Sequence, residues 1–260
     1  MRIVVCVKYV PDALADRAFD QEDHTTDRVG VQGLLSELDE HAVEEALRLA
    51  EPDDGEVIAL TVGPAAAREA MSKALQMGVH SGVHVDDAAI HGSDAAATSL
   101  VLAGAIRKIG MPDLVLTGMA STDGAMGVVP AMVAERLGLP QLTFASEVTV
   151  EGSVVRIRRD GDAASETIEA GLPAVVSVTD RTNEPRYPSF KAIMAAKKRT
   201  VRSWSLADLG IDASQVGLDA AWTRVDAITR RPPRRQGEIV TDDGHGGTAL
   251  AGFLAAHRLI

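Results

Sequence analysis

A glycine-rich run in the middle of the chain has the composition of a phosphate-binding loop. Residues 118–127 read Gly-Met-Ala-Ser-Thr-Asp-Gly-Ala-Met-Gly, follow an apolar stretch typical of a strand and precede a segment with helical periodicity. Such a loop exposes backbone N–H groups and the positive end of a helix, which suits a phosphate without a lysine or arginine. It lacks the G-x-G-x-x-G and Walker spacings, and glycine-rich turns without a ligand are the commoner case. The run is therefore a candidate phosphate site, with an unliganded turn as the alternative.

No other pattern of residues points to catalysis. The seven histidines form no H-E-x-x-H motif, there is no G-x-S-x-G nucleophile elbow, and the single cysteine, Cys6, lies inside a strand-like apolar run. We therefore expect Cys6 to be a core thiol, and we expect neither a metal centre nor a nucleophile or acid–base pair. One cysteine permits no internal disulfide, which is typical of a reducing compartment and predicts a cytoplasmic protein.

Charge and hydropathy exclude two further classes of function. Residues 1–130 hold 9 basic and 21 acidic side chains, whereas residues 131–260 hold 17 and 16. The acidic half and an aromatic content of 3% argue against nucleic acid, which needs a positive surface and stacking partners. No uninterrupted apolar stretch approaches the roughly 20 residues of a membrane helix, so we expect no membrane insertion.

Strand-like apolar runs alternate with segments of helical periodicity in the first half of the chain. The expected strands are 3–7, 57–62, 83–85 and 114–117, and the expected helices are 39–50, 65–77, 94–109 and 127–137. This alternation predicts right-handed βαβ crossovers, and therefore a Rossmann-like α/β fold with a mostly parallel sheet and helices on both faces. Ligands bind such sheets at the carboxyl ends of the strands, which points to the loops 8–12, 61–65 and 118–130.

Two details of the first helix can be predicted from its residues. Asp39 is a suitable N-cap residue because it precedes the apolar positions Ala42, Val43 and Ala46. Glu44 and Glu45 are expected on the solvent side of that helix.

The pattern changes after residue 140. Segments 147–150 and 154–158 alternate with period two around a Glu-Gly turn, which predicts a β-hairpin, and segments 167–170 and 174–178 continue the β-rich part. The sequence Arg-Arg-Pro-Pro-Arg-Arg at 230–235 precedes an apolar helix expected near 249–260. We predict a nucleotide-binding α/β domain over 1–229 and a C-terminal linker and helical arm over 230–260. The arm packs either on another protein or back on its own domain.

One segment names a family. Residues 183–198, Asn-Glu-Pro-Arg-Tyr-Pro-Ser-Phe-Lys-Ala-Ile-Met-Ala-Ala-Lys-Lys, closely resemble the signature of the electron-transfer flavoprotein beta (small) subunit. The preceding Leu-Pro-Ala-Val-Val at 172–176 also fits that signature. Further matching motifs occur in order along nearly the whole chain, at 7–12, 42–47, 63–64, 74–78 and 138–141.

The resemblance implies a fold, cofactors and partners. The family is a heterodimer whose large (alpha) subunit holds most of a redox FAD. The small subunit is a Rossmann-like domain of the adenine nucleotide alpha-hydrolase type that binds a structural AMP, completes the FAD environment and carries a recognition loop, here 178–200. Acyl-CoA dehydrogenases of fatty acid beta-oxidation and related flavoenzymes pass electrons to the FAD, which passes them to a membrane quinone oxidoreductase. The chain would therefore be an electron-carrier subunit and not an enzyme.

The same resemblance assigns residues to these roles. Contacts to AMP would come from the strand ends and the glycine-rich loop: Cys6, Ser36, Glu37, Leu38, Asp39, Val62, Gly118, Ser121, Thr122, Asp123, Gly124, Ala125, Met126, Gly127, Val128 and Val129. Contacts to dehydrogenases would come from the recognition loop: Asn183, Glu184, Pro185, Arg186, Tyr187, Pro188, Phe190, Ile193, Met194, Lys197 and Lys198. Asp160 matches an acidic position that approaches the large subunit near the flavin, and a plain surface aspartate is the alternative.

Phe190 stands where the family often has leucine, and would be the apolar anchor of the docking loop. The alternative is that Phe190 only packs against the helix that follows it. The chain also departs from the family at the nucleotide site. Ser36-Glu37 replaces the usual Asn-Pro, and the family's Gln-Ala and acidic, glutamine-containing run in the phosphate loop becomes Ala-Ser at 120–121 and Gly-Ala-Met-Gly-Val at 124–128. These changes remove side-chain donors, so we predict that main-chain amides hold most of the phosphate.

Two rival functions belong to other classes. An electron-bifurcating flavoprotein would hold a second, reactive FAD in the small-subunit site, with NADH as the donor. A stand-alone nucleotide-binding protein of the universal-stress type would need no partner and would lack the 183–198 segment.

Overall fold

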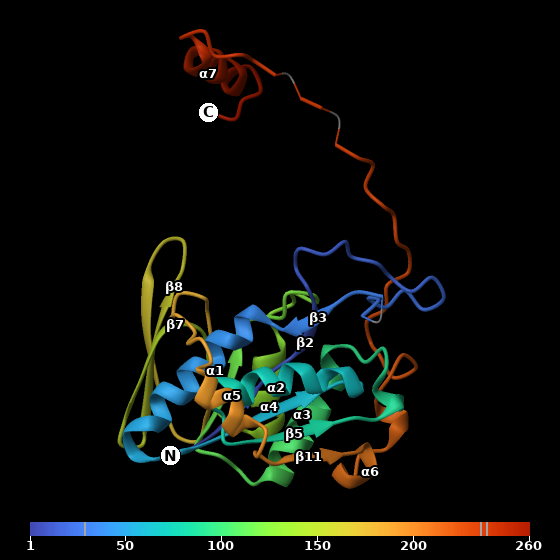
Figure 1. Cartoon of the computed structure of the whole chain (residues 1–260), viewed down its shortest axis with the longest axis vertical. Coiled ribbons are helices and arrows are strands. Elements are labelled where there is room, and N and C mark those ends of the chain that lie inside the picture. The colour runs from blue at the N-terminus through green and yellow to red at the C-terminus, as the bar shows by residue number, and fades with distance from the viewer. Residues whose placement is uncertain (29, 235, 238) are drawn as a thin grey trace. The chain divides into compact units, whose positions relative to one another are not determined.

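The structure is a computed structural model that describes residues 1–28, 30–234, 236–237 and 239–260. The chain divides into two compact units, residues 1–226 and 227–260 (Figure 1). The predicted arm began at residue 230, and its packing on another protein stays a prediction.

The first unit is built on one large sheet. Among the described residues this sheet has nine strands in the order β11-β5-β4-β1-β6-β10-β7-β8-β9. Neighbours from β11 to β7 run parallel, whereas β7, β8 and β9 form an antiparallel meander. The strands are β1 (Arg2–Cys6), β4 (Glu56–Val62), β5 (Ser81–Val85), β6 (Leu114–Gly118), β7 (Gln141–Glu151), β8 (Val154–Asp160), β9 (Ser165–Gly171), β10 (Ala174–Val178) and β11 (Val201–Trp204).

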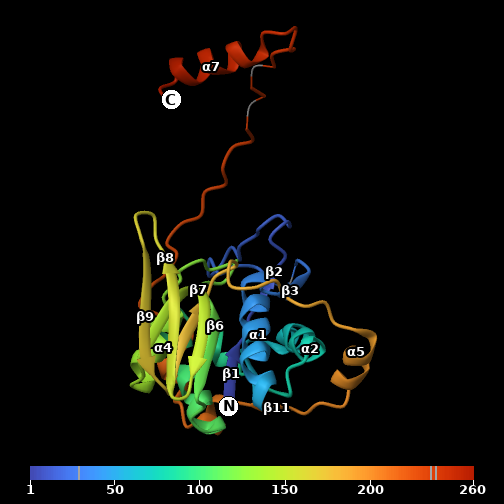
Figure 2. The ribbon, with the colours of Figure 1, turned by 90° about the vertical axis from the view of Figure 1, so that its left-hand side faces the viewer.

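Helices cover both faces of the parallel part, as predicted (Figure 2). Helices α1 (Glu37–Ala50), α2 (Arg68–Met77) and α5 (Phe190–Ala196) lie on one face. Helices α3 (Ala95–Ile109), α4 (Val129–Leu137) and α6 (Leu206–Leu209) lie on the other. The fold class is therefore a Rossmann-like α/β fold with a mostly parallel sheet, plus a β-hairpin extension.

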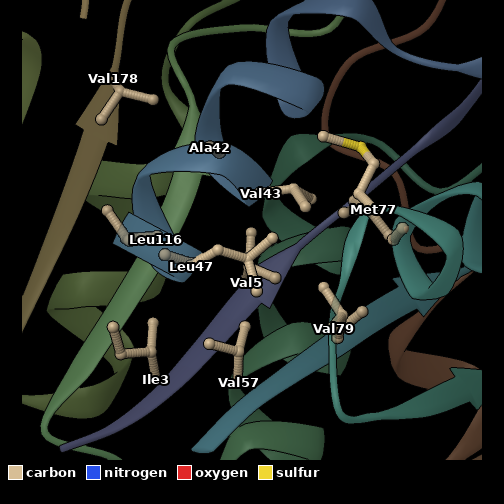
Figure 3. Packing of buried hydrophobic residues seen from close by; sticks show 14 of the residues in the cluster. Ile3, Val5, Ala42, Val43, Leu47, Val57, Met77, Val79, Leu116 and Val178 are labelled. Atoms are coloured by element: carbon tan, nitrogen blue, oxygen red, sulfur yellow. The ribbon is translucent and has the colours of Figure 1, made fainter. Parts of the chain in front are cut away.

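Alternate side chains of each strand supply the two cores. On β1, Ile3 and Val5 belong to the core under α1 and α2, whereas Val4 belongs to the core under α3 and α4. Figure 3 shows Val5 beside Leu47 of α1, and Ile3 and Val43 belong to the same cluster. Strands buried on both faces read as continuous apolar runs, which is why the sequence reveals them clearly.

A small antiparallel ladder in the first loop was not predicted. Residues 11–36 look irregular in the sequence, but β2 (Tyr9–Pro11) pairs with β3 (Gly33–Leu35) at the boundaries of that segment. Gly33 pairs with Pro11, and a Cβ atom at Gly33 would lie 2.0 Å from Cζ of Tyr9, so the tyrosine ring requires a glycine at this position. The ladder places the first residues of α1 at the carboxyl end of β1.

The second unit contains α7 (Gly246–Ala256), which begins three residues before the predicted start. None of its residues is buried, and Leu250 and Phe253 are 59% and 47% exposed. Within the described parts of the chain, no helix is long and apolar enough to cross a membrane.

Candidate functional site

The predicted nucleotide residues gather at the carboxyl edge of the parallel strands. From β1 the chain moves outward through β4 and β5, and it returns to the other side of β1 at β6. The strand order therefore reverses between β1 and β6, which is where ligands bind in open α/β sheets. Lys8 follows β1, Gly118 ends β6, and Ser36 precedes α1 at this point.

Asp39 connects α1 to both central strands and is not the N-cap that its sequence position predicts. Ser36 occupies the N-cap, and its side chain makes no capping hydrogen bond. The buried Asp39 carboxylate instead accepts from the backbone N–H of Lys8 at 2.8 Å and of Gly118 at 3.3 Å. A Cβ atom at Gly118 would lie 2.6 Å from Oδ1 of Asp39, so this junction requires a glycine.

Burial makes the Asp39 carboxyl an unusually weak acid. Loss of hydration raises the pKa of this carboxyl from 3.8 to about 7, against the opposing effect of its two N–H donors. Burial and the nearby Asp39 carboxyl raise the pKa of the Cys6 thiol to about 12, so this cysteine stays protonated. Cys6 is thus the buried free thiol that the sequence predicts.

The raised pKa of Asp39 predicts a pH-dependent stability. Between pH 4 and pH 7 the folded chain keeps a proton that the unfolded chain has lost. The free energy of unfolding should therefore fall as pH rises through this window, by at most about 1.4 kcal/mol per pH unit, and then level off. Urea unfolding of Asp39→Asn should show a flatter dependence than the wild type. Asp113→Asn, which alters an exposed carboxylate that also accepts a backbone N–H, is the control. Parallel curves for wild type and Asp39→Asn would contradict the assignment.

Two buried hydroxyls at this edge lack a hydrogen-bond partner among the described residues. They are Oγ of Ser36 and Oγ1 of Thr61, and Thr61 directly precedes the predicted contact Val62. Buried polar atoms are nearly always satisfied in native proteins, so both are candidate ligand contacts. Thr61 begins the strand-end loop 61–65 that the sequence predicts, although it was not among the individual contacts assigned to the nucleotide.

The glycine-rich loop presents unused backbone donors. Ala125 and Gly127 have positive φ values of 51° and 67°, which curl the loop before α4. In the described structure, the N–H groups of Met126, Gly127 and Val128 have no acceptor within the protein. These amides lie beside the N-terminus of α4, which is an arrangement that suits a phosphate.

Charged side chains also reach this loop, which the sequence did not reveal. The fully buried Asp123 carboxylate pairs with Nζ of Lys8 at 2.8 Å and with the guanidinium of Arg28 at 2.6 Å. These two cations hold the pKa of Asp123 well below its usual range, against the effect of burial. Arg17 donates to the backbone carbonyl of Thr122 at 2.6 Å.

Gly127 offers a test of the loop as a nucleotide site. A side chain at φ 67° is strained, and a Cβ atom there would also lie 3.4 Å from Phe144. Gly127→Ala should therefore shift the loop amides and weaken nucleotide binding about 5- to 10-fold, as expected for a loss of about 1 kcal/mol. The control is Gly138→Ala, because Gly138 has φ 68° with nothing within 4 Å. Equal nucleotide affinity of the two variants, measured by calorimetry, would contradict this role.

The predicted recognition loop is fastened to α1 by two polar residues. The side-chain amide of Asn183 donates to the carbonyl of His41 at 3.0 Å and to Glu45 at 2.9 Å. The guanidinium of Arg186 donates to Glu44 at 2.7 Å and 3.0 Å. The expectation that Glu44 and Glu45 face solvent is wrong: they are 6% and 1% exposed, because this loop covers them.

Three large apolar residues of the same loop are exposed to solvent. Tyr187 is 94% exposed, Phe190 80% and Met194 47%. Phe190 is the first residue of α5, which Ser189 caps by accepting from the N–H of Ala192. Its exposure means that Phe190 does not pack against its own helix.

The remaining predicted residues are spread around these two regions. Glu184, Lys197 and Lys198 are exposed, and Pro185, Pro188 and Ile193 are half-buried. Asp160 ends β8 and accepts hydrogen bonds from Arg158 and Ser165 at 2.9 Å and 2.6 Å. The nucleotide residues form one edge of the sheet, the loop 183–198 lies along α1 and α2, and Asp160 belongs to the hairpin extension.

The fold and its strand-end site define an α/β protein of the Rossmann-like class. The family described as "Electron transfer flavoprotein domain" matches residues 23–209. The electron transfer flavoprotein subunit beta of Mycobacterium bovis is 45% identical, with 99% of each chain covered. That of Megasphaera elsdenii is 34% identical over 92% of this chain and 91% of its own. A protein of Acetobacterium woodii named caffeyl-CoA reductase-Etf complex subunit CarD is 34% identical over 98% of this chain and 97% of its own.

The chain therefore belongs to the electron transfer flavoprotein family, as a small (beta) subunit.

Proposed function

We propose that this chain binds AMP, completes the environment of an FAD held mainly by the large (alpha) subunit, and docks acyl-CoA and related dehydrogenases. Their electrons would pass through the heterodimer toward a membrane quinone oxidoreductase. The FAD, when bound, supplies the redox chemistry. The residues of this chain bind the nucleotide, shape the surroundings of the flavin and position the partner. A cytoplasmic location would suit its single reduced thiol.

The main support for docking is the way the loop is held. Asn183 and Arg186 fasten it to the buried carboxylates of α1, while Tyr187 and Phe190 stay in solvent. Ordering a loop that carries two exposed aromatic rings contributes little to the stability of the isolated chain, because the rings stay in water. Exposed aromatic side chains on a fixed scaffold are typical hot spots of protein–protein interfaces.

The strand-end site fits an adenine nucleotide on two counts. Ser36 holds a buried hydroxyl without a partner, and the free N–H groups of residues 126–128 suit a phosphate. Cys6, Leu38 and Val62 lie at the same edge and would line the site. We also propose that Asp160 contacts the large subunit, and that residues 230–260 pack on it through the exposed apolar side chains of α7.

Co-expression with the large subunit tests the proposal. The two chains should purify as a 1:1 heterodimer, and its flavin should be reduced when an acyl-CoA and its dehydrogenase are added. Phe190→Asp should form the same heterodimer but accept electrons poorly. A heterodimer whose flavin no acyl-CoA dehydrogenase reduces would contradict the docking role. Failure of the two chains to associate would contradict the proposed assembly.

The Acetobacterium woodii relative favours a second candidate, because its name places it in an enzyme complex. In that case the chain would belong to an electron-bifurcating flavoprotein with a second FAD in the strand-end site and NADH as donor. Reduction of the heterodimer by NADH without a dehydrogenase would support this candidate.

A further inference from the structure

Three cations from separate parts of the chain converge on the glycine-rich loop. Lys8 follows β1, whereas Arg17 and Arg28 belong to the segment 12–32 between β2 and β3. We propose that Lys8, Arg17 and Arg28 contribute side-chain contacts to the phosphate dianion of the nucleotide, in addition to those of the main-chain amides. This inference rests on the proposed AMP site and names residues for it that the family resemblance does not supply.

Asp123 positions two of these cations. Its carboxylate has no exposed surface, and its Oδ1 accepts from Nζ of Lys8 while its Oδ2 accepts from Nε and Nη2 of Arg28 at 3.1 Å and 2.6 Å. The N–H of Gly124 also donates to Oδ1 at 2.7 Å. Nζ of Lys8 lies 3.3 Å from Oγ of Ser121, so the ammonium group is held directly against the loop.

The charges of this cluster do not balance. Arg17 donates to the carbonyl oxygens of Thr122 and Asp123, and in the described part of the chain no carboxylate lies within ion-pair distance of it. Three positive charges therefore meet the carboxylate of Asp123 and the nearby carboxyl of Asp39, whose pKa is raised to about 7, so that positive charge is in excess. A phosphate monoester carries nearly two negative charges at neutral pH, which would neutralise the remainder.

Basic side chains are scarce in the first half of the chain, yet they are concentrated at the glycine-rich loop. Residues 1–130 contain only 9 basic side chains against 21 acidic ones, yet three of these nine meet at one loop. Free backbone donors at residues 126–128 follow immediately in the chain. The segment 12–32 is also tied down at a distance, because Asp23 pairs with His91 at 2.7 Å. The segment that carries Arg17 and Arg28 is therefore anchored both at the glycine-rich loop and at His91.

Titration of the heterodimer, refolded without nucleotide, with AMP and with adenosine tests this inference. Arg17→Gln and Arg28→Gln should each weaken AMP binding about 10-fold, as expected for a lost charge-assisted contact to phosphate. Both variants should leave adenosine binding within about 2-fold of the wild type, because adenosine lacks the phosphate. Arg17→Gln is the variant less prone to misfolding, since among the described residues Arg17 hydrogen-bonds to carbonyl oxygens alone and its loss leaves none of their carboxylates unpaired.

Arg156→Gln is the matched control. Arg156 pairs with Glu169 at 2.6 Å on the exposed β8–β9 hairpin, and its loss should change neither affinity. The inference is overturned if the variants bind AMP as the wild type does, or if they lose adenosine and AMP equally, which would indicate a purely structural role. A wild-type heterodimer that binds neither compound would instead overturn the AMP site itself, and the inference with it.

Discussion

Phe190→Ala is expected to raise the concentration of acyl-CoA dehydrogenase needed for half-maximal flavin reduction about 30-fold, which corresponds to about 2 kcal/mol of docking energy. The ring is 80% exposed and stands at the start of α5. Its removal therefore takes away contact area with the partner without leaving a cavity in this chain. The rate of flavin reduction, measured against dehydrogenase concentration, gives the effect directly.

Leu14→Ala is the control for this prediction. Leu14 is 96% exposed and lies in the segment 12–32, outside the recognition loop. That variant should accept electrons as the wild type does, and both variants should keep their nucleotides. An equal effect of the two substitutions would show that Phe190 is not a specific anchor.

Arg186→Ala should lower the free energy of unfolding by about 2–3 kcal/mol, because it leaves a buried carboxylate without its charged partner. The side chain of Glu44 is 8% exposed, and the Arg186 guanidinium binds it through Nε and Nη2. The recognition loop should also become more accessible to proteases, because the contacts of Arg186 to α1 are lost and those of Asn183 remain. Urea unfolding and limited proteolysis measure these effects.

Arg181→Ala, which alters an exposed arginine of the same loop, should change stability by less than about 0.5 kcal/mol. Adding Glu44→Gln to Arg186→Ala should recover part of the loss, because the unpaired charge is then absent. If Arg186→Ala and Arg181→Ala unfold at the same urea concentration, the proposed fastening is wrong.

The parallel sheet could be predicted because its signals are local. Runs such as 57–62 and 114–117 are apolar on both faces, and glycines at 78, 110 and 138 mark the ends of the helices between them. The short ladder of β2 and β3 was missed because three-residue strands have too little pattern. The ladder also brings the Tyr9 ring close to Gly33, a residue distant from it in sequence.

The site was predicted less completely than the fold. The glycine-rich loop and the strand ends follow from their place after apolar runs. Burial of Glu44 depends on a loop more than a hundred residues away, and the contacts of Arg17 and Arg28 depend on how segment 12–32 folds back. Side chains brought together only by tertiary structure leave no periodic signal in the sequence. The recognition loop was predicted from the family resemblance. The structure shows that Asn183 and Arg186 hold this loop on α1 while Tyr187 and Phe190 are exposed.

The nucleotide content of the purified heterodimer tests the account most directly. The complex is denatured, and the released AMP and FAD are quantified by mass spectrometry against the protein concentration. One AMP and one FAD per heterodimer is the result that the proposed electron carrier predicts. Two FAD and no AMP would contradict it and would support the bifurcating alternative.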